Sequence, residues 1–195
     1  MKSNITIEGL EGSTMHCVNL FGADNVTLKN ITFDVTNAKM GYDDEGVAKM
    51  PASIITGDNN NSANKGAHNL IIDGCTFTGT SNNGATIAFT DFHRTEGYSG
   101  NITIKNCTFK ATGVGGDIYA HYTGDSANGH GNFVIENNTF ETSGFIYLGR
   151  YASNIPVVLK NNTFKVATNL DDAIYVQDHS NYGVSVDASN NTFAN

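Results

Sequence analysis

One short pattern recurs along this chain of 195 residues: alternating apolar positions, a polar turn that contains Asn, and a closing Thr-Phe pair. Side chains alternate between the two faces of a β-strand, so the apolar positions of each copy share one face. Such an internal repeat points to a repeat architecture. A front half of the pattern occurs at Asn4–Gly9, and the full copies are Asn25–Phe33, Asn69–Phe77, Asn101–Phe109, Asn132–Phe140, Pro156–Phe164 and Val184–Phe193.

The copies are unevenly spaced, because their closing Phe residues lie 44, 32, 31, 24 and 29 positions apart. Helical repeats such as ankyrin have a unit length that packing fixes, so this irregularity excludes them. It is typical of a solenoid in which regular strands are joined by loops of variable length.

A second strand is expected between consecutive copies. Its alternation places an Ile column on one face, with Phe89, Ala120, Leu148 and Val176 two residues further along. The segments are Ser53–Thr56, Thr86–Phe89, Asp117–Ala120, Phe145–Leu148 and Ala173–Val176, and the column is Ile54, Ile87, Ile118, Ile146 and Ile174.

The segment around each Thr-Phe pair supplies a third strand. Three short strands per turn over about six turns predict an all-β fold, a single-stranded parallel β-helix formed by residues 1–195 as one domain. Neighbouring turns would lie about 4.8 Å apart, so the Phe residues would stack inside the solenoid. An Asn marks the bend in four of the copies, because Asn tolerates positive φ and its amide can bond its counterpart in the next turn. These bend residues are Asn30, Asn106, Asn137 and Asn161.

From Asn4 to Phe193 the pattern resembles the β-helix repeat of the pectate-lyase-like superfamily. That superfamily includes polysaccharide lyases, pectinesterases, polygalacturonases, phage tailspikes and non-catalytic bacterial adhesins. The resemblance implies a right-handed coil, which the general preference of parallel crossovers supports. It also implies an extracellular or bacterial cell-surface location. It does not select one activity, because one scaffold carries many functions.

The catalytic motifs of the enzymatic members are missing. Neither Arg94 nor Arg150 stands in the Arg-x-Pro-x-x-Arg pattern that the resemblance to pectate lyases would require. Gly129–Gly131 and Asp171–Asp172 match two polygalacturonase motifs in reversed order, and we interpret them as a loop and a solvated turn. An unfamiliar enzymatic site stays open as the alternative, and its candidate residues are Asp91, His93, Arg94 and His121.

The cysteines match no metal-site spacing. Cys75 and Cys107 occupy the same repeat position, which indicates a ladder of buried small side chains, with a disulfide between them as the alternative. Cys17 is interpreted as a core residue. Three acids within Gly41–Gly46 could ligate Ca²⁺, but the alternating spacing of a calcium loop is missing. We therefore expect no cofactor, with Ca²⁺ kept as the alternative.

The outward side of the second strand offers the best candidate surface. If the Ile column points inward, Tyr119, Tyr147 and Tyr175 point outward in three successive turns. Tyrosine rings flanked by polar groups suit a sugar chain, although a purely structural aromatic ladder fits the same pattern. The expected flanking ligand-binding residues are His121, Gln177, Arg150 and Asp178.

Charge narrows the range of partners. The net charge is −8 and there are only two arginines, so binding to nucleic acid is not expected. No apolar run reaches the roughly 18 residues of a spanning helix, so no membrane insertion is expected.

The leading hypothesis is a non-catalytic extracellular module that binds a polysaccharide, another glycan or a surface partner. The alternatives are a polysaccharide lyase or glycoside hydrolase acting on an acidic polysaccharide, and a structural spacer or a segment of a longer solenoid with flanking domains.

Overall fold

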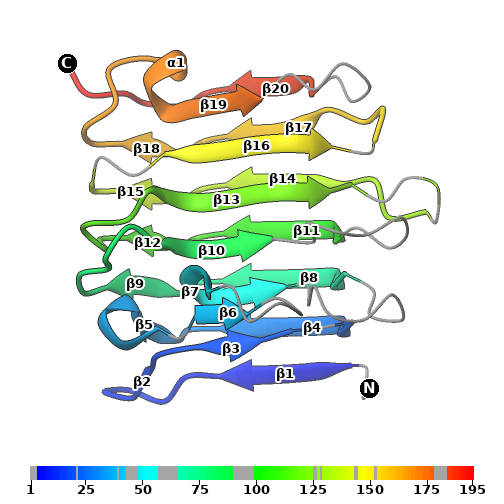
Figure 1. Cartoon of the computed structure of the whole chain (residues 1–195). Helices are drawn as coiled ribbons and strands as arrows, with labels where there is room; N and C mark the ends of the chain where they lie inside the picture. Colours follow the sequence, from blue (N-terminus) through cyan, green and yellow to red (C-terminus); the bar gives the residue numbers. More distant parts are fainter. Residues whose placement is uncertain are drawn as a thin grey trace.

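The repeat strands pair turn by turn into three parallel sheets, as Figure 1 shows. The computed structural model describes residues 4–20, 22–38, 40–42, 48–56, 66–89, 99–124, 127, 129–142, 145–151, 153–177 and 184–195; the side chains of 40–42, 48–50, 121–122 and 150–151 are not included. Each strand pairs with the strand one turn before and after it, so equivalent positions of the repeat lie side by side.

Sheets A, B and C follow one another along each turn. Sheet A contains β1 (Ile5–Glu8), β4 (Asp24–Lys29), β8 (His68–Asp73), β11 (Gly100–Lys105), β14 (Phe133–Glu136), β17 (Val157–Lys160) and β20 (Val186–Ser189). Sheet B contains β2 (Thr14–Met15), β5 (Thr32–Asp34), β9 (Thr76–Thr78), β12 (Thr108–Phe109), β15 (Thr139–Phe140) and β18 (Thr163–Phe164). Sheet C contains β3 (Val18–Asn19), β7 (Ala48–Thr56), β10 (Ala85–Phe89), β13 (Gly116–Thr123), β16 (Ile146–Tyr151) and β19 (Ile174–Gln177).

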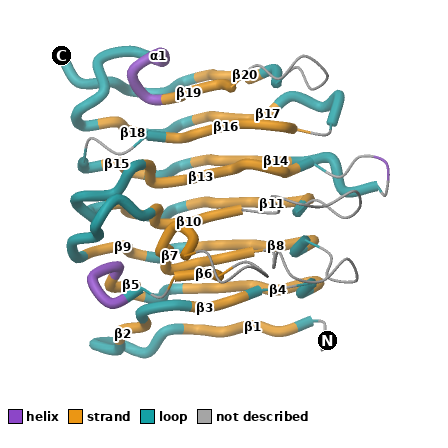
Figure 2. Tube along the Cα trace, viewed as in Figure 1, coloured by secondary structure: helices purple, strands orange, loops and turns teal. Residues whose placement is uncertain are grey.

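The chain is a right-handed parallel β-helix, which confirms the predicted fold class. Within the described residues, the strands from β1 to β19 make six turns of three strands, and β20 begins the next turn. The turns stack along one axis from the N-terminus to the C-terminus, and Figure 2 shows the loops at the corners between the strands.

The core lies inside the coil, where the inner faces of the three sheets meet. The predicted Phe column is confirmed: consecutive rings from Phe33 to Phe193 stack with centroids 4.6–5.4 Å apart. The predicted Ile column of sheet C is also in register from Ile54 to Ile174. In-register stacking follows from the repeat, because each residue packs against its own equivalent one turn away.

The corner between sheets A and B depends on left-handed backbone. Asn30, Asn106, Asn137 and Asn161 have φ of 53–56°, as predicted, and Gly74 takes the same place with φ 66°. The side chains differ from the expectation. Asn30 donates to Glu8 Oε1 at 3.2 Å and Asn106 donates to Asp73 Oδ1 at 2.7 Å, so these amides bond acidic neighbours rather than one another. The left-handed residue turns its side chain outward, and the residue after it points inward.

Three short elements depart from the repeat. Strand β6 (Met40–Tyr42) pairs with β7 in the antiparallel direction. A 3₁₀ turn, η1 (Val35–Asn37), follows β5, and Asp34 caps it by accepting from the Thr36 N–H at 3.0 Å. One helical turn, α1 (Leu170–Ala173), precedes β19 and is capped by Asn169. Asp171 and Asp172, predicted to lie in a solvated turn, are exposed in α1.

Candidate functional site

The predicted tyrosine ladder is present on the outer face of sheet C. Tyr119, Tyr147 and Tyr175 are paired in register on β13, β16 and β19. Their rings stack with centroids 4.5 Å and 5.5 Å apart and with interplanar angles of 9° and 23°. The inward direction of the Ile column therefore fixed the outward direction of these rings, as alternation requires.

The stacking decides which part of each ring can meet a ligand. Tyr147 lies between its two neighbours, so both faces of its ring are covered. Among the described strands of sheet C, β19 is the last, and its Tyr175 is 54% exposed. One face of Tyr175 is thus the part of the ladder that could stack on a sugar ring.

The same row becomes buried toward the N-terminal end of the solenoid. Tyr119 pairs with Ala88, which pairs with Ile55, and these two are only 1% and 4% exposed. Together with Ala52 and Ala85 they form a small apolar cluster, the outer cluster, against which Cys17 and Tyr119 pack. The outer face of sheet C therefore has a covered half at β7 and β10 and a more exposed half at β16 and β19.

A buried polar column lies beside this row. Ser53, Thr86 and Asp117 precede the in-register Ile54, Ile87 and Ile118, and all three are 0% exposed. The Thr86 hydroxyl donates to Asp117 Oδ1 at 3.4 Å, while Asp117 Oδ2 and Ser53 Oγ have no hydrogen-bond partner among the described residues. Burial raises the pKa of Asp117 to about 7, and the Thr86 hydrogen bond partly opposes that rise.

The other predicted ligand-binding residues are only partly described. The backbone pairs His121 with Gly149 and Gly149 with Gln177, so the expected row beside the tyrosines exists, and Gln177 is half-buried. The side chains of His121 and Arg150 lie outside the described residues. Four further candidates also lie outside them: Asp91, His93, Arg94 and Asp178.

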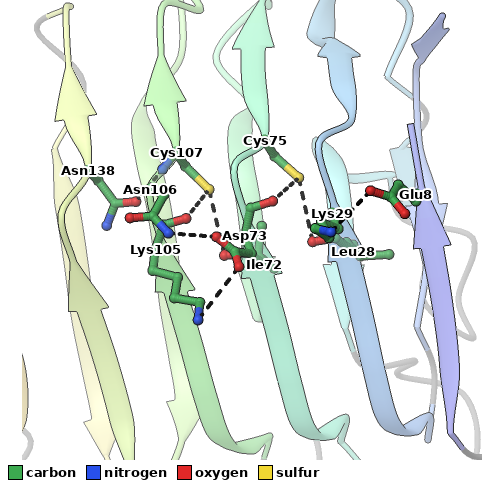
Figure 3. A network of polar contacts seen from close by, with 10 residues as sticks. All are labelled: Glu8, Leu28, Lys29, Ile72, Asp73, Cys75, Lys105, Asn106, Cys107 and Asn138. Carbon is green, nitrogen blue, oxygen red and sulfur yellow. Dashed lines mark hydrogen bonds and ion pairs between the residues drawn. The ribbon is translucent and has the colours of Figure 1, made fainter. Parts of the chain in front are cut away.

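The cysteines belong to a buried ladder at the corner between sheets A and B. Cys75 and Cys107 are free, fully buried thiols, as predicted. Their sulfurs bond the carbonyls of Leu28 and Ile72, each at 3.7 Å (Figure 3). Burial raises the pKa of the Cys107 thiol, which keeps it protonated and makes a reactive role unfavourable.

An asparagine ladder continues this column in the following turns. Asn138 Oδ1 accepts from the Cys107 N–H at 2.9 Å, and Asn162 and Asn191 repeat the arrangement one and two turns later. Their amide nitrogens donate to the carbonyls of Ile104, Ile135 and Leu159. The sequence signal that could have predicted this ladder is the second Asn of each Asn-Asn pair. The function of the ladder is structural.

Two further classes of site receive no support from the described residues. They contain no group of three or more His, Cys, Asp or Glu side chains arranged to hold a metal ion. They also contain no helix that is long and apolar enough to cross a membrane. The acidic segment Gly41–Gly46, considered for Ca²⁺, lies mostly outside the described part of the chain.

Comparison with known proteins leaves the outer face of sheet C to be interpreted from its geometry alone. No family model, no curated protein and no solved structure matches this chain.

Proposed function

We propose that this chain is a non-catalytic, extracellular carbohydrate-binding module of the pectate-lyase-like type, and that its ligand contacts the exposed end of the tyrosine ladder. The observation that carries the proposal is the 54% exposed ring of Tyr175 at the end of an ordered aromatic row. Stacking fixes the orientation of this ring before a ligand arrives, and preorganisation lowers the entropic cost of binding.

The ladder also provides polar groups in regular order. The phenol groups of successive tyrosines repeat about every 4.8 Å along the solenoid axis. A glycan that stacks one sugar on Tyr175 and runs along the row could hydrogen-bond these hydroxyls through its own. Gln177, two residues beyond Tyr175 on the same face, could add an amide contact. A linear polysaccharide therefore suits the ladder better than a single sugar.

Affinity electrophoresis in gels containing a uronate polymer or a neutral glycan tests this function. Tyr175→Ala should weaken binding roughly two- to tenfold, because an aromatic stacking contact contributes about 0.5–1.5 kcal/mol. Ile71→Ala is the matched control, since Ile71 is an exposed apolar residue on the outer face of sheet A. If no glycan retards the protein, or if Tyr175→Ala and Ile71→Ala behave alike, the carbohydrate-binding proposal is wrong and a structural spacer becomes the better interpretation.

One observation favours the second candidate, a polysaccharide lyase or glycoside hydrolase. Asp117, on the same face of β13 as Tyr119, has a pKa of about 7, and a carboxyl group protonated near neutral pH suits general acid catalysis. Its 0% exposure argues against direct contact with a substrate. Incubation with uronate polymers, with assays for unsaturated products and new reducing ends, separates the two functions. Product formation that Asp117→Asn abolishes would support the enzyme.

A further inference from the structure

The corner between sheets A and B carries the same sequence triplet, Asn-x-Thr, in five turns of the coil. The middle residue x is Ile, Cys or Asn and in no case Pro. At the surface of a secreted protein this triplet is the acceptor for an N-linked oligosaccharide. The five triplets are Asn30–Thr32, Asn106–Thr108, Asn137–Thr139, Asn161–Thr163 and Asn190–Thr192.

The fold directs the two defining side chains of each triplet outward. All five asparagines are exposed, and their left-handed backbone, with φ of 53–56°, forms the corner. The middle residue points into the coil, as the buried Cys107 and Asn138 do. The threonines are half-buried or exposed, and those from Thr108 to Thr192 lie in register on the outer face of sheet B. Amide and hydroxyl therefore share one outer surface, where an enzyme can reach both.

The contacts of the amide groups separate the five corners into two sets. Asn106 donates to Asp73 Oδ1 at 2.7 Å, as Figure 3 shows, and Asn30 donates to Glu8 Oε1 at 3.2 Å. The amides of the other three corners make no side-chain hydrogen bond to a described residue, and these are Asn137, Asn161 and Asn190. An amide nitrogen that already donates must first give up its partner, so the second set offers the better acceptors.

The spacing of the turns limits how many corners can be modified together. The Asn137 N–H donates to the Lys160 carbonyl at 3.1 Å, and the Asn161 N–H donates to the Ser189 carbonyl at 3.1 Å. These bonds hold successive corners about 4.8 Å apart. A branched oligosaccharide, which is several sugar rings across, is wider than one turn. Two adjacent corners of one molecule therefore have room for only one oligosaccharide.

We propose that Asn137, Asn161 and Asn190 are sites of N-linked glycosylation, and that adjacent corners are not occupied in the same molecule. In this reaction the asparagine Nδ2 forms a bond to C1 of the first sugar and loses a proton. The bond from C1 to oxygen in a lipid-pyrophosphate oligosaccharide donor breaks, and the lipid pyrophosphate leaves. The inference rests on the extracellular location in the proposed function. It does not rest on carbohydrate binding, because the corner between sheets A and B lies away from sheet C.

Secretion of the full chain from a eukaryotic host, behind a cleavable leader, supplies the donor and the transferase. Removal of the oligosaccharides with an N-glycosidase in H₂¹⁸O labels each asparagine that carried one, and peptide mass spectrometry measures the occupied fraction at each position. Asn101–Thr103 is the internal control, because the Asn101 amide is half-buried and donates to Asn69 Oδ1 at 3.0 Å. Cell-free synthesis with microsomes gives the same readout where the secreted yield is low.

A conservative variant tests the acceptor itself. Thr163→Val keeps the β-branched shape and leaves Asn161 in place, and it should abolish modification of Asn161. It should also raise the occupied fraction at the two neighbouring corners, because their competitor is gone. Thr76→Val is the matched control: Thr76 lies in the same row of sheet B, but its corner residue is Gly74, so its triplet is no acceptor. This control should leave every occupied fraction unchanged.

The outcomes separate this proposal from the proposed carbohydrate binding, which is measured on chain made without glycosylation. A secreted, folded chain with no oligosaccharide on Asn137, Asn161 or Asn190 would overturn the inference. Occupied fractions at two adjacent corners that sum to more than one would overturn the exclusion between neighbours, and so would unchanged neighbours in Thr163→Val. Equal modification of Asn101 would overturn the inference as well, because the triplet alone, and not its outward direction, would then select the site.

Discussion

At the scale of single residues, two kinds of side chain, Asn and Cys, occupy the same buried position of the repeat at the corner between sheets A and B. Asn138 and Asn162 each accept a backbone N–H and donate to a strand carbonyl one turn earlier. Cys75 and Cys107 bond the equivalent carbonyls through sulfur at 3.7 Å. A thiol is a weaker donor than an amide and offers no comparable acceptor, so the cysteine turns satisfy the backbone less completely.

We predict opposite effects for two substitutions at this corner. Asn162→Ala should lower the free energy of unfolding by about 2–3 kcal/mol, because it leaves buried backbone groups unpaired. Cys107→Asn should raise it by about 0.5–1 kcal/mol, because the new amide extends the asparagine ladder by one turn. Urea denaturation of both variants measures the difference. Destabilisation by Cys107→Asn would show that the ladder cannot be extended and that the thiol is required by packing.

At the scale of elements, the outer face of sheet A carries a column in which acids and bases alternate strictly. Lys29, Lys105 and Lys160 form ion pairs with the preceding acid at 3.1, 3.6 and 3.1 Å. Each such exposed pair contributes little by itself, but like charges in adjacent strands are unfavourable, so the alternation favours the observed pairing. The column in register is Glu8, Lys29, Asp73, Lys105, Glu136 and Lys160.

Reversing one charge tests this column. Lys105→Glu would place three acids in successive turns and should lower the free energy of unfolding by about 1 kcal/mol at low salt. In 1 M NaCl most of that loss should disappear, because the Debye length falls to about 3 Å. Lys105→Gln is the control that removes the ion pair without adding repulsion. Equal, salt-independent losses for the two variants would mean that charge plays no part.

At the scale of the whole molecule, the solenoid has no single centre, because each turn packs mainly on its two neighbours. Phe109 is fully buried and stacks on a ring at both faces, at 4.9 and 4.6 Å. Among the described rings, Phe193 stacks only on Phe164, at 5.4 Å, and it is only partly buried. In such an array stability is close to a sum of nearest-neighbour terms.

The cost of removing a ring should therefore depend on its turn. Phe109→Ala should lower the free energy of unfolding by about 3–5 kcal/mol, as expected for a large cavity in a packed core. Phe193→Ala should cost less than half as much, because it removes one stacking neighbour and leaves little enclosed cavity. Guanidinium unfolding curves compare the two. Similar losses at both positions would contradict the nearest-neighbour description.

Much of this architecture was predictable from the amino-acid order. Period-two alternation separates inward from outward side chains, and the repeat then places each residue beside its own equivalent, so the Phe and Ile columns and the outward tyrosines follow directly. The left-handed Asn corners were predictable for the same reason, since a local preference recurs in every turn. For the tyrosine ladder, the sequence predicted that the three rings lie in register, but it did not predict how exposed each ring is.

Tertiary structure alone decided the features that the repeat does not encode. The burial of Asp117 and the covered half of sheet C depend on contacts between residues in different turns. Sequence alternation says only that Asp117 faces outward; whether an outward face meets water is set by what packs on it. The sequence by itself therefore determined the coil and the direction of its side chains. The tertiary structure decided which outward side chains are buried, because burial depends on the residues that pack against a side chain.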